Sequence, residues 1–97
     1  MHYRFEWDSA KAHANVVKHG VTFDEAETVF FDLWAIEAYD WEHSLREDRL
    51  KIVGMSEHNR LLIVAFTLRD HETIRIISAR RTERNEEQAY EENLRNS

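Results

Sequence analysis

Residues 49–79 read RLKIVGMSEHNRLLIVAFTLRDHETIRIISA, and this stretch decides the fold. It holds three apolar-rich runs separated by two short polar segments: 49–55, 61–66 and 73–79, with 56–59 and 69–72 between them. In the first run, Leu50 and Ile52 alternate with basic residues, as in a half-buried strand. The middle run is apolar at every position, which is typical of a strand in the middle of a sheet. Because turns this short join antiparallel neighbours, the stretch predicts a three-stranded antiparallel meander.

The residues at the N-terminal end predict a strand and a helix. The alternation of apolar and polar residues from Tyr3 to Trp7 suits a half-buried strand. Asp8 can cap the helix that follows, and Gly20 can end it in a left-handed conformation. Three small apolar residues at helical spacing are expected to form its buried face: Ala10, Ala14 and Val17.

A second helix is predicted to begin after Thr22, which has capping-box spacing to Glu25, and to end near Asp32. Its apolar stripe is Phe23, Ala26, Val29 and Phe30. A further strand is expected at 34–41, and a mostly solvated helix after Arg81. The predicted order is therefore β-α-α-β-β-β-β-α. It describes an α+β fold in which helices pack on one face of an antiparallel sheet of four or five strands.

Length and composition exclude several classes of protein. The 97 residues suit a single domain spanning 1–97, and the absence of cysteine excludes disulfides, cysteine-ligated metals and a thiol nucleophile. No apolar run approaches the roughly 18 residues needed to cross a membrane, and no signal-peptide stretch opens the chain, so a cytoplasmic protein without membrane contact is expected. The six histidines lack metal-binding spacing and the two glycines lie far apart, so neither a metal nor a nucleotide cofactor is predicted.

The charge of the chain is unevenly distributed. The formal net charge is −6, yet residues 21–48 hold nine acids and one base, which gives −8, whereas residues 60–84 hold six arginines and three acids, which gives +3. Affinity for phosphate follows the local field rather than the total, so the basic segment could bind a nucleic acid. The simpler alternative is that these arginines keep exposed strands soluble and unpaired.

Several arginines clustered beside a histidine in the fold would suit phosphate chemistry. Arginine offers a fixed fork of donors and stays charged, and it can stabilise the charge that develops on a scissile phosphate. In RNA the 2′-hydroxyl can attack the phosphorus without a metal if a base such as histidine removes its proton. Each candidate also has a structural interpretation. Lys18 and His19 can stabilise the C-terminal end of a helix, where the helix dipole is negative. Arg49 can lie on a solvated strand face, and Arg75 can form a structural ion pair.

A set of short segments occurs in a fixed order along nearly the whole chain: Phe5-Glu6-Trp7-Asp8, Lys11-Ala12, Asn15, Lys18-His19-Gly20-Val21, Phe23-Asp24-Glu25-Ala26, Val29-Phe30, Asp32, His43-Ser44, Glu47, Arg49, Gly54, Thr67-x-Arg69 and Arg75-Ile76-Ile77-Ser78-Ala79-Arg80. Together they resemble the BrnT family, the toxin halves of bacterial type II toxin–antitoxin pairs. The resemblance implies a fold similar to RelE toxins and a metal-independent endoribonuclease that inhibits translation. It also implies an antitoxin partner with a ribbon-helix-helix domain, through which the complex would contact DNA.

Some positions depart from the pattern of the family that the chain resembles. Leu33 stands where a proline is common, Thr82-Glu83 replaces a small residue and a threonine, and Glu87 replaces an arginine. The last two lower the positive charge near the expected RNA site, which leaves open a weakly active or inactive copy. The acidic segment 21–48 could offer a surface to a basic antitoxin.

The sequence interpretation is a small RNA-cleaving toxin. The expected catalytic residues are Lys18, His19, His43, Arg49 and Arg80, and the expected substrate-binding residues are Thr67, Arg69, Arg75 and Arg81. Glu47 is a weaker candidate base. The alternative is a non-catalytic module that only docks an antitoxin or another protein. Closure of Glu83, Glu86 or Glu87 on Arg75 or Arg80 would favour this alternative, since an enzyme needs an uncompensated cationic pocket.

Overall fold

The computed structural model describes residues 3–44 and 48–97. Strands and helices follow one another in the order β1 (Arg4–Glu6), α1 (Ser9–His19), α2 (Phe23–Thr28), η1 (Val29–Phe31), β2 (Ile36–Tyr39), η2 (Trp41–His43), β3 (Leu50–Met55), β4 (Leu61–Leu68), β5 (Thr73–Arg81) and α3 (Arg84–Arg95). The α+β class agrees with the prediction, and the observed order differs from the predicted one by two 3₁₀ helices, η1 and η2. The second of these takes up Trp41, where the sequence predicted the end of a strand.

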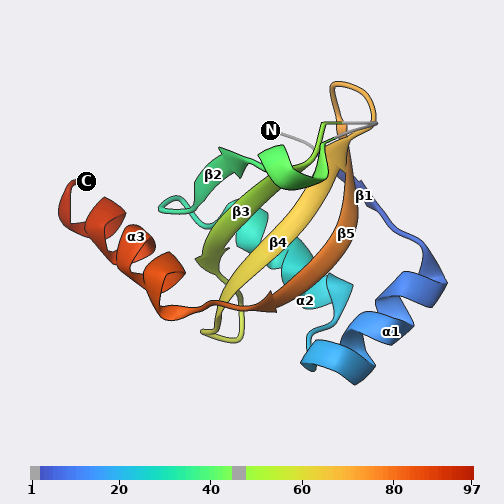
Figure 1. Ribbon diagram of the computed structural model, residues 1–97, viewed down its shortest axis with the longest axis horizontal. Coiled ribbons are helices and arrows are strands. Elements are labelled where there is room, and N and C mark those ends of the chain that lie inside the picture. The colour runs from blue at the N-terminus through green and yellow to red at the C-terminus, as the bar shows by residue number, and fades with distance from the viewer. Residues whose placement is uncertain (1–2, 45–47) are drawn as a thin grey trace.

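The five strands form one sheet in the order β1-β5-β4-β3-β2 (Figure 1). The strands β2 to β5 are antiparallel neighbours, as the short turns predicted, and the wholly apolar β4 lies in the centre. β1 pairs with β5 in parallel, with Phe5 opposite Ile74. The predicted antiparallel sheet is therefore wrong at this edge, and the sheet is mixed. Short turns fix the direction only of strands that follow each other, whereas two helices and three strands separate β1 from β5.

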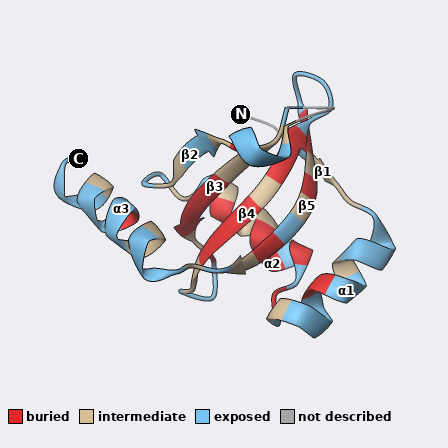
Figure 2. Ribbon diagram, in the orientation of Figure 1, coloured by how far each residue is buried: buried red, intermediate tan, exposed pale blue. Residues whose placement is uncertain are grey.

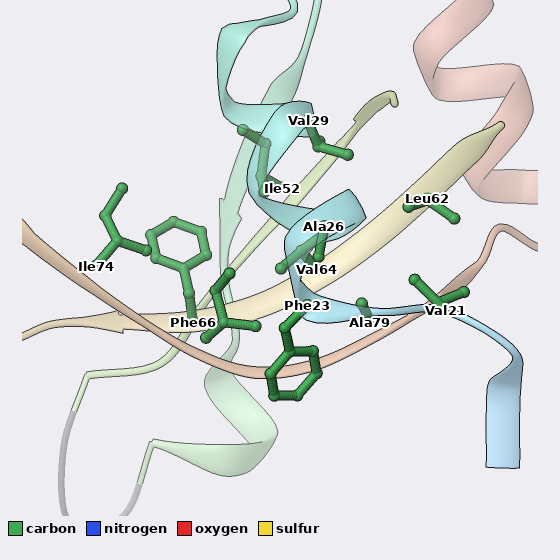
Figure 3. Packing of buried hydrophobic residues seen from close by; sticks show 11 residues of the cluster. Val21, Phe23, Ala26, Val29, Ile52, Leu62, Val64, Phe66, Ile74 and Ala79 are labelled. Atoms are coloured by element: carbon green, nitrogen blue, oxygen red, sulfur yellow. The ribbon is translucent and has the colours of Figure 1, made fainter. Parts of the chain in front are cut away.

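The main core lies between the sheet and the helix α2, which passes behind the sheet in Figure 1. Figure 3 shows Phe23 and Ala26 of α2 meeting strand residues such as Val64 and Phe66. Buried segments concentrate on β3, β4, β5 and α2, whereas α3 is mostly exposed (Figure 2). The predicted stripe of the second helix is thus confirmed at Phe23, Ala26 and Val29.

Helix α1 has the predicted ends but a different buried face. Asp8 caps it by accepting a hydrogen bond from Ala10 N, and Gly20 ends it at φ 68°. The predicted face is wrong, because Val17 is 76% exposed and Asn15 is buried instead. The Asn15 amide donates to Val21 O at 2.9 Å and Ala79 O at 2.8 Å, and it accepts from Ala79 N at 3.1 Å. A single polar side chain therefore ties α1 to β5.

Helix α3 packs against the opposite face of the sheet, so the prediction of helices on one face is also wrong. Tyr90 is buried with Val53 and Ile63, whose side chains alternate with those of the main core. The Tyr90 hydroxyl donates to Asp32 Oδ2 at 2.6 Å, and burial followed by this hydrogen bond raises the pKa of Tyr90 to about 12. Within residues 3–44 and 48–97, no helix has the length and apolar character required to cross a membrane.

Candidate functional site

A hollow lies on the open face of the sheet, the face opposite α2. Lys51, Ala65 and Ser78 form one row across β3, β4 and β5, and the two small side chains leave room above the strands. The hollow has a volume of about 250 Å³, and its described lining is Asp40, His43, Arg49, Lys51, Ile63, Ala65, Ser78 and Arg80. In Figure 1 this face is turned toward the viewer, between η2 and α3. Three cations against one carboxylate make it a site suited to a phosphate group.

A β-bulge turns Arg80 toward this hollow. Ala65 pairs with Ser78 but Phe66 pairs with Ile76, so β5 contains one extra residue at Ile77. Ile76 faces the core, and uninterrupted alternation would also direct Arg80 there. The extra residue reverses the alternation, which buries Ala79 and places Arg80 on the open face.

Asp40 links two basic groups at the rim of the hollow. Its carboxylate lies 3.0 and 3.1 Å from His43 Nδ1 and 4.0 Å from Lys51 Nζ, and the residue is only 4% exposed. Burial disfavours the charged carboxylate, but the His43 hydrogen bond and the Lys51 charge outweigh it, so the pKa of Asp40 is lowered. Asp40 is therefore ionised at neutral pH. In neutral His43 it holds the proton on Nδ1, which leaves Nε2 as an acceptor.

Ser44 links the backbone at Asp40 to the backbone at Arg49. Its hydroxyl donates to Asp40 O at 2.6 Å and accepts from Arg49 N at 3.0 Å, while Asp40 N donates to Arg49 O at 2.8 Å. Arg49 forms no ion pair with the described residues, and its buried Nε has no hydrogen-bond partner among them. Arg49 is thus the cation of the hollow that the described carboxylates leave uncompensated. Glu47, the weaker candidate base, lies outside the described residues.

Arg80 is paired with a carboxylate from α3. Its two terminal nitrogens donate to Glu86 Oε1 and Oε2 at 2.9 and 2.8 Å, and Glu86 also accepts from Glu83 N at 2.7 Å as part of a capping box. Burial opposes ionisation of Glu86, yet the Arg80 hydrogen bonds keep its pKa lowered, while the same pairing raises the pKa of Arg80. A glutamate that closes on Arg80 in this way is the feature that the sequence analysis expected to favour a binding module over an enzyme.

The predicted substrate-binding residues lie in part outside the hollow. Arg75 and Arg69 both contact Glu6 Oε2, at 2.6 and 3.7 Å, on the same open face toward β1. Thr67 lies opposite Arg75 and is buried, with no partner for Oγ1 among the described residues. Arg81 lies opposite Leu62, on the core side of the sheet.

Two predicted catalytic residues, Lys18 and His19, are not among the residues that line the hollow. They end α1, which Asn15 ties to the core side of β5. Of the five predicted catalytic residues, the structure brings together His43, Arg49 and Arg80.

Four residues of the site were not predicted as such: Asp40, Lys51, Ser78 and Glu86. Two signals in the sequence could have indicated some of them. Lys51 shares its strand face with Arg49 by simple alternation, and Asp40 precedes His43 by three residues, one turn of a 3₁₀ helix. No group of three or more histidine or acidic side chains suited to a metal occurs among the residues that the structure describes.

Comparisons with known proteins agree with this geometry. The family described as "Ribonuclease toxin, BrnT, of type II toxin-antitoxin system" matches residues 7–86. The chain is similar to the ribonuclease toxin BrnT of Brucella abortus, known from a crystal structure at 1.1 Å resolution, with 25% identity and a TM-score of 0.65. The match covers 84% of this chain and 99% of that one. No curated protein matches the chain. Since the family match spans 80 of the 97 residues, the chain belongs to the BrnT family of ribonuclease toxins of type II toxin–antitoxin systems.

Proposed function

We propose that this chain is a metal-independent endoribonuclease that inhibits translation by cleaving RNA in the hollow on the open sheet face. We also propose that residues 1–97 act as one toxin domain. The observation that carries the proposal is the convergence of His43, Arg49, Lys51 and Arg80 on a single hollow with a small-residue floor. A general base and several fixed cations are the groups that phosphoryl transfer from a ribose hydroxyl requires.

In the proposed reaction, His43 Nε2 takes the proton of the 2′-hydroxyl, and the 2′-oxygen attacks the adjacent phosphorus. The bond from phosphorus to the 5′-oxygen breaks, which leaves a 2′,3′-cyclic phosphate and a 5′-hydroxyl. Protonated His43 or a water molecule supplies the proton of the leaving oxygen. Arg49 and Lys51 stabilise the negative charge that grows on the phosphoryl oxygens, a role that a metal ion fills in other nucleases.

Arg80 has a different role in this proposal. Glu86 compensates its charge and fixes its direction, so Arg80 orients the phosphate while Arg49 supplies most of the uncompensated charge. Arg69, Arg75 and Thr67 lie on the same face and would contact the next part of the RNA strand. No role in the hollow is proposed for the residues on the other side of the sheet: Lys18, His19 and Arg81.

The second candidate function is the non-catalytic module, because the Arg80–Glu86 pair neutralises one of the three cations. In either case membership of a type II family implies an antitoxin partner. We propose that this antitoxin carries a ribbon-helix-helix domain and that DNA is contacted only through it.

The test is cleavage of a mixed-sequence RNA by the purified chain in EDTA, beside Arg49→Ala and His43→Gln. We expect the parent to cleave and each variant to lose about 100-fold or more in rate, since one stabilising group contributes about that factor. Arg95→Ala, in the exposed last turn of α3, is the matched control and should cleave like the parent.

Equal cleavage by the parent and Arg49→Ala would place the activity elsewhere or in a contaminant. A folded parent that leaves RNA intact would favour the binding module.

A further inference from the structure

The main core is left open at one end, on the face of the sheet opposite the ribonuclease hollow. Two hollows of about 270 and 320 Å³ lie there and share Leu50 and Leu68 in their linings. The larger one also reaches Thr67 at the end of β4, whose side chain lies on the other face. The surface around them, here called the end groove, consists of Tyr3, Phe30, Tyr39, Leu50, Ile52, Phe66, Leu68 and Ile74. These are core-type side chains, and Phe66 and Ile74 belong to the main core itself. The end groove is thus a part of the hydrophobic core that remains accessible from the surface.

Large apolar side chains are exposed around the end groove. Leu68 is 54% exposed within it. Trp41 is 82% exposed, and its ring lies 4.3 Å from that of Tyr39. Exposed large apolar side chains beside an accessible hollow are typical of a protein interaction site.

The rim of the end groove is acidic. Glu37 lines one hollow and Asp48 lines the other, where Asp48 accepts a 2.6 Å hydrogen bond from the Tyr39 hydroxyl. His71 is the one basic side chain among the described residues that line them. An apolar floor with a carboxylate rim repels phosphate, so RNA does not suit this surface. It suits a protein segment with large apolar side chains and basic neighbours.

We propose that the end groove docks a basic segment of the antitoxin, which inserts apolar side chains over Leu50 and Leu68. The proposal builds on the proposed function, in which the cationic hollow on the opposite face takes the RNA. Binding of the partner and cleavage of RNA would then use different hollows, which share none of their described lining residues. A variant can therefore lose one of the two and keep the other.

The experiment measures two quantities for each variant: affinity for the cognate antitoxin by isothermal titration calorimetry, and RNA cleavage without antitoxin. Leu68→Lys places a cation in the groove, and Glu37→Lys reverses one rim charge. We expect each to weaken antitoxin binding about tenfold or more, since like charge at an interface opposes association. Cleavage by both variants should stay within about twofold of the parent, because neither residue lines the cationic hollow.

Matched controls carry the same changes elsewhere. Val17→Lys lies on the exposed face of α1 and Glu91→Lys on α3, and both should bind antitoxin like the parent. Circular dichroism verifies that each variant is folded. Glu37→Lys changes an exposed residue and so provides the test if Leu68→Lys fails to fold.

Unchanged antitoxin affinity in both groove variants would overturn the proposal. So would a groove variant that only converts a dimer of this chain to a monomer, because the occupant would then be a second copy. Loss of RNA cleavage with normal antitoxin binding would assign the groove to the substrate instead. A parent that cleaves no RNA but binds antitoxin through the groove would reject the proposed function and leave the docking surface standing.

Discussion

At the scale of single residues, the open face is organised by carboxylates that hold cations in place. Asp40 holds His43 and Lys51, Glu86 holds Arg80, and Glu6 holds Arg75 and Arg69. Such pairing reduces the net positive charge but fixes the directions of side chains that are otherwise long and mobile. Arg49 is the exception on this face among the described residues, and there only its backbone is held, with its N–H donating a hydrogen bond to Ser44 Oγ.

The role of Asp40 can be tested with a double-mutant cycle. If Asp40 acts by fixing the tautomer of His43, Asp40→Asn should lower kcat about 10- to 100-fold and leave KM nearly unchanged, because the phosphate-binding cations remain. In a His43→Gln background the same change should have little further effect, since there is no imidazole to orient. Initial rates of RNA cleavage in the four proteins measure this coupling.

A purely structural role of Asp40 predicts a different pattern. The two substitutions would then act additively on the rate, and Asp40→Asn would lower the melting temperature in both backgrounds. Thr28→Ala is a suitable control for folding alone. The Thr28 hydroxyl donates to Glu25 O and accepts from Glu57 N, and it makes no hydrogen bond to His43 or Asp40.

At the scale of elements, the hydrophobic pattern predicted the existence of helices and strands better than their faces and directions. The meander β3–β4–β5 follows from its apolar runs and short turns. The face of α1 did not, because the pattern considers only apolar area, whereas Asn15 satisfies three hydrogen bonds at buried backbone groups. The parallel pairing of β1 depends on contacts far apart in sequence and leaves no local signal.

The same limit applies to the site. His43, Arg49 and Arg80 were predicted, and the hollow brings them together. Uninterrupted alternation would have turned Arg80 into the core, and only the bulge at Ile77 reverses this. A bulge depends on how two strands pair, so β5 alone does not reveal it. Asp40 was missed because its role depends on burial beside Lys51.

Helix α2 is tied to the β3–β4 turn by a partly buried ion pair. Thr22 caps the helix, as predicted, but the Glu25 side chain does not close a capping box. Its carboxylate accepts from Arg60 Nε at 2.9 Å and Ser56 Oγ at 2.6 Å, and a second Arg60 nitrogen donates to it as well. The Arg60 hydrogen bonds outweigh the effect of burial and lower the pKa of Glu25 below its ordinary value of 4.5.

Arg60→Ala should therefore destabilise the protein in a pH-dependent way. A carboxylate with a lowered pKa contributes stability above its ordinary value, and this contribution is lost as the pH falls through the folded-state pKa. We expect a loss of about 2–3 kcal/mol in the free energy of unfolding at pH 7, and a smaller difference from the parent at pH 3. Urea unfolding at both pH values measures it, with Arg95→Ala as the exposed control. A difference that does not depend on pH would contradict this account of Glu25.

At the scale of the whole molecule, an acidic chain presents a basic face. The formal charge of −6 disfavours nucleic acid at long range, but at physiological salt the Debye length is about 8 Å, so distant carboxylates are screened. Under the proposed function, a phosphate in the hollow would then interact mainly with Arg49, Lys51 and Arg80. Glu37 and Asp48 line the end groove instead, where they would favour a basic protein. Two hollows without a shared lining residue thus differ in the charge that they favour.

The small number of available cations in the hollow predicts a shallow salt dependence of RNA binding. For single strands, the slope of log K against log salt is about −0.7 for each phosphate neutralised. Glu86 compensates Arg80, whereas Asp40 lies 4.0 Å from Lys51 and binds His43 more closely, so Arg49 and Lys51 count as two available cations. We therefore expect a slope of about −1.4. Arg49→Ala should reduce its magnitude by about 0.7, and Glu86→Gln should increase it by about 0.7, because Arg80 becomes available. Fluorescence anisotropy with a 2′-O-methyl RNA, which lacks the attacking hydroxyl, measures binding without cleavage. If Glu86→Gln left the slope unchanged, Arg80 would not face the bound phosphate, and orientation of the substrate would fall to Arg49 and Lys51 alone.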